Sequence, residues 1–211
     1  MIAMLCSGPY VADHDDFGAE LVVAAEMYGK PYYHSYFIVP KDSPVTNLEG
    51  LRGKTFAFTD PKSNTGCIVP TYMLSKRGES VNSFFSSSQY SGHHSKSIEM
   101  VAKKEVDGAA VDHLIWDYMN NTNPVLTSRT KVINKSPAYG MQPIVVHPAI
   151  DPRLKTKIKE IFLNMHFDKD GKRILGKIFI DRFIVPEEKN YDTVREMIKF
   201  LEKSKKKEGS K

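Results

Sequence analysis

Cysteine is scarce in this sequence, with only Cys6 and Cys67 among 211 residues. Two cysteines this far apart can form one disulfide or none, so they do not identify a redox compartment. Long apolar runs are lacking too, and no segment approaches the roughly 18–20 apolar residues that a membrane-spanning helix needs. The first residues, "MIAMLCSGPYV", have no basic leader before their short apolar stretch, so they do not predict a signal peptide.

Sequence signatures of catalysis are also missing. The chain has no nucleophile elbow, no phosphate loop ending in Gly-Lys-Ser/Thr, and no zinc or dinucleotide-binding motif. "DHDD" at 13–16 offers oxygen ligands without a partner at a diagnostic spacing. "DKDG" at 168–171 starts like a calcium loop, but Lys172 and Phe179 stand where further ligands are needed. We therefore expect a protein that is not an enzyme and that uses no metal ion and no cofactor.

The composition is that of an ordinary globular chain, 41% hydrophobic and 26% charged, with a formal net charge of +5. Part of the positive excess lies in the C-terminal "LEKSKKKEGSK", which predicts a flexible basic tail over 203–211. This tail has no interleaved aromatic residues, and no nucleic-acid-binding motif lies near it. We therefore expect no nucleic-acid partner.

The apolar and turn-forming residues predict alternating strands and helices. The run at 2–5 predicts a strand that ends in a Gly-Pro turn or a helix start. The composition of 17–28 favours a helix, although three consecutive branched residues, 21–23, count against it. Between residues 55 and 112, strand, helix and strand in this order predict an α/β unit with parallel pairing. Further strands are predicted at 32–40, 55–60, 106–112 and 144–147, and helices at 65–76, 95–104, 154–165 and 191–201.

Small polar residues follow the predicted strand at 55–60. Ser63, Asn64, Thr65 and Gly66 lie at the start of the next predicted helix. A helix N-terminus offers unpaired N–H groups and about half a positive charge, so it favours anions. The hydroxyls add hydrogen-bond donors, and glycine lets the backbone approach a ligand closely. An ordinary helix cap, which uses the same residue types, is the alternative interpretation.

A second segment of the same kind, "SSSQYSGHHSKS" at 86–97, again leads into a predicted helix. His94 at this helix start could donate a hydrogen bond to an oxyanion, while a solvated capping histidine is the alternative. Asp60 and Asp112 end predicted strands and could act as general bases, but nothing in the sequence pairs them with a nucleophile. Binding is therefore favoured over catalysis.

Four blocks, taken together and in order, resemble the phosphate, phosphite and phosphonate substrate-binding proteins of ABC transporters. They are "LEGLRGKTFAFTDPKSNTGCIVP", "SGHHSKSIEMVAKKEVDGAAVD", "VINKSPAYGMQPIVV" and "DGKRILGKIFIDRF" with "YDTVREM". The resemblance covers nearly the whole chain except the lysine tail. It implies the type II periplasmic-binding-protein fold, with two α/β lobes that close over the ligand. Lobe I would comprise residues 1–39 and 133–211, and lobe II residues 40–132.

The resemblance also implies site residues. The family's "DPxSTSG" loop, which holds the phosphonyl oxygens, matches 60–66, with Asn64 in place of threonine and Thr65 in place of serine. The histidine of the family's "GSHD" motif falls on His94, and the tyrosine of "GPYV", which lines the cleft from the other lobe, falls on Tyr10. The candidate ligand-binding residues are therefore Tyr10, Ser63, Asn64, Thr65 and His94, with Gly66, Asp112 and Tyr139 as further candidates.

Some family members hold the amino group of an aminoalkylphosphonate with acidic residues. Leu114 and Tyr139 mark the positions where we would align such an acid, and neither region supplies one. A small phosphorus oxyanion such as phosphite, phosphate or methylphosphonate therefore fits better than aminoethylphosphonate. The resemblance implies binding without chemistry, as the substrate-binding component of an ABC importer. The same fold also serves as an extracytoplasmic ligand-sensing domain of signalling proteins, and this is the alternative.

The resemblance carries further expectations about partners and location. The protein partner would be the membrane permease of the transporter, and the full-length form would be periplasmic or extracytoplasmic, with a lipid anchor as one option. Family members are longer, and a first strand–helix–strand portion of lobe I has no counterpart here. We therefore expect a truncated lobe I with an uncovered apolar sheet edge, through which the chain could dimerise.

Overall fold

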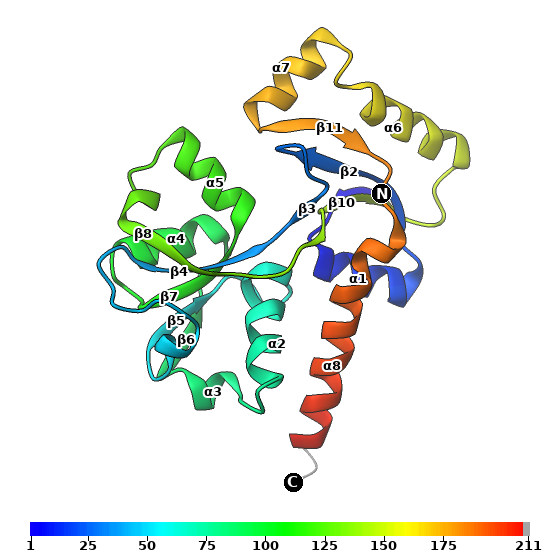
Figure 1. Cartoon of the computed structure of the whole chain (residues 1–211). Helices are drawn as coiled ribbons and strands as arrows, with labels where there is room; N and C mark the ends of the chain where they lie inside the picture. The colour runs from blue at the N-terminus through cyan, green and yellow to red at the C-terminus, as the bar shows by residue number, and fades with distance from the viewer. Residues whose placement is uncertain (209–211) are drawn as a thin grey trace. The chain divides into compact units, whose positions relative to one another are not determined.

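The computed structural model describes residues 1–208, which form two compact units (Figure 1). Unit 1 consists of Met1–Tyr33 and Ala138–Arg195, and unit 2 consists of His34–Pro137 together with the described residues 196–208. The lobe boundaries expected from the resemblance, at 39/40 and 132/133, lie a few residues inside unit 2.

Unit 1 is built on an antiparallel sheet with the strand order β1-β10-β2-β11. Its strands are β1 (Ile2–Met4), β2 (Glu20–Met27), β10 (Pro143–Val146) and β11 (Ile180–Ile184). Its helices are α1 (Ser7–Phe17), α6 (Pro152–Asn164), α7 (Lys169–Lys177) and the short 3-10 turn η4 (Glu188–Tyr191). Helix α6 packs on β2 and β11, and a separate small ladder joins β3 (Tyr32–Tyr33) to β9 (Tyr139–Gly140).

The helix expected over 17–28 is wrong, because β2 occupies most of that stretch. Strand β2 lies in the interior of the sheet and pairs with β10 on one side and β11 on the other. Val22, Val23, Ala24 and Ala25 are all buried there. A run of apolar residues with two adjacent β-branched side chains suits a strand covered on both faces, and this burial overrides the helical composition.

Unit 2 is built on a mixed sheet with the strand order β6-β5-β7-β4-β8. Its strands are β4 (Ser35–Pro40), β5 (Thr55–Phe58), β6 (Ser87–Tyr90), β7 (Gly108–Asp112) and β8 (Thr130–Lys135). Its helical segments are η1 (Glu49–Leu51), η2 (Asn64–Ile68), α2 (Val69–Ser75), α3 (Val81–Phe84), α4 (His94–Ala102), α5 (His113–Thr122) and η3 (Thr127–Arg129). Strand β5 is parallel to both β6 and β7, which confirms the parallel α/β unit predicted from the sequence.

The parallel strands bring three helix starts together. Strand β5 leads to η2, β6 leads to α4, and β7 leads directly to α5. Because the carboxyl ends of parallel strands meet at the same edge of a sheet, these three helix N-termini begin at one edge. Strand β6 itself was missed by the sequence analysis, since its four residues are all exposed and polar or aromatic, with no apolar alternation to mark them.

The last helix, α8 (Asp192–Glu208), begins in unit 1 and continues in unit 2. In unit 1, Arg195 pairs with Asp15, Glu188 and Asp192. In unit 2, the Phe200 ring packs edge-on against Tyr72 of α2 at 5.3 Å between ring centroids. The helix extends through most of the stretch expected to be a flexible tail, and 209–211 lie outside the described residues. Over residues 1–208, no helix has the length and apolar character needed to cross a membrane.

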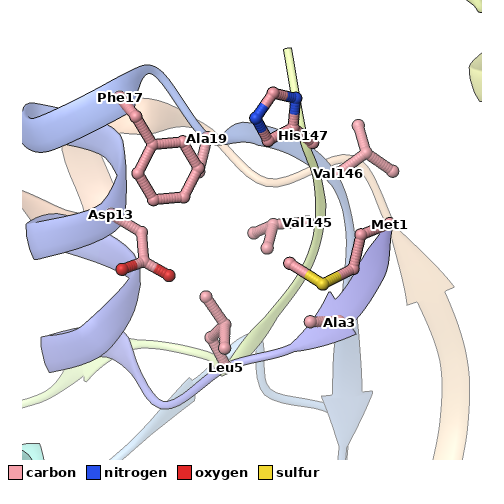
Figure 2. A pocket seen from close by; sticks show the side chains of 9 residues that line it. All are labelled: Met1, Ala3, Leu5, Asp13, Phe17, Ala19, Val145, Val146 and His147. Atoms are coloured by element: carbon pink, nitrogen blue, oxygen red, sulfur yellow. The ribbon is translucent and has the colours of Figure 1, made fainter. Parts of the chain in front are cut away.

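Strand β1 is an edge strand of unit 1. Met1 and Met4 are 85% and 55% exposed, and residues 1–5 carry no charged side chain, whereas the opposite edge strand β11 carries Asp181 and Arg182. Beside β1, a pocket of about 70 Å³ opens between α1 and β10 (Figure 2). Its lining is Met1, Ala3, Leu5, Asp13, Phe17, Ala19, Val145, Val146 and His147. Charged edge residues normally discourage pairing with another strand, and this edge lacks them.

Candidate anion-binding site

The segment after β5 folds into a tight turn that starts the helix η2. The Lys62 N–H donates to the Asp60 carboxylate at 2.8 Å, and the Ser63 N–H donates to the Asp60 carbonyl at 3.0 Å. The Ser63 hydroxyl oxygen then caps η2 by accepting from the Gly66 N–H at 3.1 Å. Helix η2 is a π-helical turn, a feature that recurs at functional sites.

Pro70 fits into this helix because of an unusual pairing. A proline in a helix has no N–H to give the carbonyl four residues before it, which here is that of Gly66. The Gly66 carbonyl instead accepts from the N–H of Thr59 at 3.1 Å, at the end of β5. The helix predicted over 65–76 therefore starts one residue earlier and passes through Pro70, with its first turn joined to the sheet.

Gly66 is required for the same close approach. A Cβ at this position would lie 2.2 Å from the Thr59 hydroxyl oxygen and 2.5 Å from the Thr59 Cβ. Any larger residue would push η2 away from β5. The sequence predicts that this glycine lets a ligand approach the backbone. The structure shows that close packing against Thr59 also requires glycine at this position. Its N–H is already donated to Ser63.

The side chains at the start of η2 are buried. Ser63 is 7% exposed, and Asn64 and Thr65 are both 0% exposed. The carbonyl of Thr65 accepts from the Ser35 hydroxyl at 2.6 Å, which fixes the residue on the sheet. The Thr65 hydroxyl oxygen, however, is buried with no hydrogen-bond partner among residues 1–208. A buried hydroxyl without a partner costs about 1–3 kcal/mol, so this atom calls for a ligand or another explanation.

His94, the first residue of α4, lies against this turn. Its Nδ1 accepts from the main-chain N–H of Asp112 at 3.0 Å, and its Nε2 lies 3.5 Å from the Ser63 hydroxyl oxygen. Burial, together with the neighbouring His93, lowers the pKa of His94 to about 4. The imidazole is therefore neutral at pH 7, and because Nδ1 accepts, its proton lies on Nε2.

Asp112 joins β7 to α5. It is 1% exposed, and its carboxylate accepts from the Leu114 N–H at 2.9 Å, which caps α5. The cap on α5 and the hydrogen bond from its main-chain N–H to His94 hold Asp112 beside the candidate site. Any direct contact between its carboxylate and a ligand remains a prediction.

Tyr10 and Tyr139, the candidates from the other part of the sequence, belong to unit 1. Tyr10 is buried in α1, its hydroxyl donates to the Glu188 carboxylate, and its ring packs edge-on against Tyr191 at 4.7 Å between centroids. Burial and the Glu188 carboxylate raise the pKa of Tyr10 far above its ordinary value. Tyr139 in β9 is buried and faces Tyr33 edge-on. Their roles as ligand contacts also remain predictions.

Two residues of this site were missed by the sequence analysis. Thr59 touches both Gly66 and His94, with its hydroxyl oxygen 3.2 Å from the His94 Nδ1. Its position at the end of a strand, directly before the polar loop, was a signal that could have identified it. Ser35 has no such local signal, because it meets Thr65 only through the pairing of strands far apart in the sequence.

The two cysteines are free thiols. Burial raises the pKa of the Cys67 thiol, which lies in η2 behind the polar turn and 3.7 Å from the Tyr90 hydroxyl. Within the described part of the chain, no group of three or more His, Cys, Asp or Glu side chains could hold a metal ion.

Two solved structures have the same fold as this chain. A binding-protein component of an ABC phosphonate transporter from Pseudomonas aeruginosa aligns with a TM-score of 0.87 at 24% identity, over 97% of this chain and 69% of that chain. A Prochlorococcus marinus protein solved in complex with methylphosphonate aligns with a TM-score of 0.83 at 22% identity, over 96% of this chain and 78% of that chain. The chain therefore has the type II periplasmic-binding-protein fold.

The family follows from the sequence. Residues 2–191 match the family of ABC transporter, phosphonate, periplasmic substrate-binding proteins, and the chain belongs to this family. The phosphonates-binding periplasmic protein of Escherichia coli K12 is 32% identical over 184 residues, which cover 85% of this chain and 54% of that protein. A probable ABC transporter phosphite binding protein of Prochlorococcus marinus is 26% identical over 194 residues, 86% of this chain and 65% of that protein. The chain thus spans roughly half to two thirds of the length of these curated relatives, and the resemblance read from the sequence is confirmed.

Proposed function

We propose that this chain is the substrate-binding component of an ABC importer for a small phosphorus oxyanion. The family supports this, and curated relatives are named as a phosphonates-binding protein, a probable phosphite binding protein and a phosphate-import protein. The observation that carries the proposal is the Thr65 hydroxyl, which is buried without a hydrogen-bond partner among the described residues at the first turn of a helix. Family membership supports binding rather than catalysis as the activity.

In this proposal the oxyanion accepts hydrogen bonds from the start of η2 and from His94. The Ser63 oxygen already accepts from Gly66, so its own proton is free to point toward a ligand. Thr65 contributes its hydroxyl, Asn64 its amide, and His94 its Nε2–H. The N-terminus of the continuous helical segment 64–75 adds its partial positive charge, so the site needs no lysine or arginine. Hydrogen bonds to a charged acceptor contribute about 1.5–3 kcal/mol each.

Two of the remaining candidate residues, Tyr10 and Asp112, could contact a ligand only under specific conditions. Tyr10 can donate to a ligand only after its hydroxyl leaves the Glu188 carboxylate. Asp112 can receive a protonated ligand oxygen only with carboxylate lone pairs that the Leu114 N–H does not use. Gly66 and Tyr139 complete the proposed set of ligand-binding residues.

The proposal includes the partner and place that such a component needs. The protein partner is the membrane permease of the importer, and the full-length protein works outside the cytoplasmic membrane, free or lipid-anchored. Dimerisation through the β1 edge of unit 1 is also retained as a proposal. The exposed methionines of that edge and its lack of charged side chains support it.

The test is titration calorimetry of the purified chain with phosphate, phosphite, methylphosphonate and aminoethylphosphonate, with sulfate as the control anion. Thr65→Val keeps the shape and removes the hydroxyl, so we expect affinity for the bound anion to fall about 10- to 100-fold. The same change removes a buried group without a partner, so the ligand-free protein should become more stable by about 1–3 kcal/mol. Thr46→Val, at an exposed threonine of unit 2, is the matched control.

If Thr65→Val binds the anion more weakly and is more stable without ligand, the Thr65 hydroxyl serves ligand binding at the expense of the stability of the ligand-free protein. Unchanged affinity in Thr65→Val would contradict the assignment of the anion to η2. Binding of sulfate as tightly as the phosphorus anions would contradict the proposed substrate class.

A further inference from the structure

The Nδ1 atom of His94 has two close polar neighbours. The main-chain N–H of Asp112 donates to it at 3.0 Å, and the hydroxyl oxygen of Thr59 lies at 3.2 Å. A main-chain N–H can only donate, so Nδ1 must present its lone pair. A lone pair of the Thr59 oxygen facing that nitrogen would be repelled, so the Thr59 hydroxyl must turn its proton toward Nδ1. The same hydroxyl donates to the Ala110 carbonyl at 3.3 Å, so its single proton is shared between that carbonyl and Nδ1.

Protonation of His94 would reverse this arrangement. A proton on Nδ1 would point at the Asp112 N–H, so two donors would face each other in a buried site. The other titratable groups around the ring do not offset this. His93, the residue that caps this helix, acts on His94 as a like charge. Asp60 is exposed in the preceding turn, and the Asp112 carboxylate faces the α5 N-terminus and His113.

We infer that Thr59 is a positioning residue, which together with the Asp112 N–H fixes His94 as the neutral tautomer with its proton on Nε2. This inference rests on the proposed function, because it assigns the Nε2–H as the donor to the anion. The fixed ring supplies the same donor from pH 8 to pH 5. The pH dependence of anion binding then follows the ionisation of the ligand and not that of His94.

The same threonine sets the distance between the two helix starts. Its Cβ and hydroxyl occupy the space beside Gly66 of η2, while its hydroxyl contacts His94 of α4. Thr59 therefore fixes both the position of η2 and the tautomer of the histidine that faces it.

The experiment is a long-range proton–nitrogen NMR correlation on the ligand-free chain with ¹⁵N-labelled histidine. The chain has seven histidines, and a His94→Gln variant assigns the signal. We expect the wild-type ring to show a protonated Nε2 and an unprotonated Nδ1 from pH 8 to pH 5. Thr59→Val keeps the branched shape without the donor and should mix the tautomers or bring titration into this range. Thr59→Ser keeps the hydroxyl and should behave as the wild type.

Each outcome decides the inference. A proton on Nδ1, or a wild-type ring that titrates near the ordinary histidine range, would overturn it. Wild-type behaviour in Thr59→Val would show that the Asp112 N–H suffices, and Thr59 would lose the assigned role. Thermal unfolding of each variant checks that it folds, and Thr59→Ala replaces Thr59→Val if the latter does not. Because the NMR measurement uses no ligand, its result is separate from the calorimetry that tests the proposed function.

Discussion

Replacing Gly66 by alanine tests whether the turn is held by its contact with Thr59. The new Cβ would lie 2.2 Å from the Thr59 hydroxyl oxygen and 2.5 Å from its Cβ. Both distances are far shorter than normal contacts, and the closer atoms belong to a buried residue on the sheet. Either η2 or the end of β5 must therefore move.

The expected magnitude follows from two opposing effects. Overpacking of a close contact costs about 1–3 kcal/mol. Alanine is favoured over glycine in a helix by about 1 kcal/mol. Gly66 does not need a positive φ, so the backbone itself tolerates alanine. We expect a net loss of stability of up to about 2 kcal/mol, and a larger relative loss of anion affinity because the Thr65 hydroxyl and the His94 Nε2 move apart.

Urea unfolding measures the stability, and calorimetry with the best-binding anion measures the affinity. Gly176→Ala in α7 is the control, since a Cβ there meets no atom within 4 Å. We expect that control to be as stable as the wild type or up to about 1 kcal/mol more stable, with unchanged affinity. A Gly66→Ala protein with wild-type stability and affinity would refute the claim that this contact positions the turn.

Three further predictions follow from other parts of the structure. Tyr10→Phe removes the hydrogen bond to the half-exposed Glu188 and should lower the free energy of unfolding by about 0.5–1.5 kcal/mol in urea; no loss would contradict the bond. The pKa of His94 is lowered to about 4 in the folded protein, from an ordinary 6.5. As the pH falls, the unfolded chain therefore binds a proton at a higher pH than the folded chain does. Stability should therefore be full above pH 6.5 and fall toward pH 4, by at most about 1.4 kcal/mol per pH unit, and His94→Gln should abolish that slope. Met4→Lys adds a charge to the β1 edge, so light scattering should show it shifting a dimer to the monomer, and an unchanged mass would contradict dimerisation there.

Local features of the fold, such as helix starts, could be predicted from the sequence more accurately than the pairing of segments that are far apart in the chain. The parallel pairing around β5 and the helices predicted from 65 and from 95 were confirmed, with each helix starting one residue earlier, because turn-forming and capping residues mark them locally. The error over 17–28 arose because only pairing with β10 and β11, distant in sequence, decides between helix and strand there. Helix α8 beyond 203 was missed for a related reason. Its composition suggests a solvated end, while Phe200 packs against α2 and supports the helix before it.

For the candidate site, residue types could be predicted but their hydrogen-bond roles could not. A loop of Ser, Asn, Thr and Gly before a helix is typical of an ordinary cap as well as of an anion site, and the structure shows the cap. Ser63 caps the helix, whereas the buried Thr65 hydroxyl has no partner within residues 1–208. Similarly, the sequence allowed His94 to bind an anion more strongly when protonated. The main-chain N–H of Asp112 points at its Nδ1 and makes that state unfavourable. In the proposed function, the donors to the anion are therefore neutral groups at helix N-termini, and the partial positive charge of the backbone there does not change with pH.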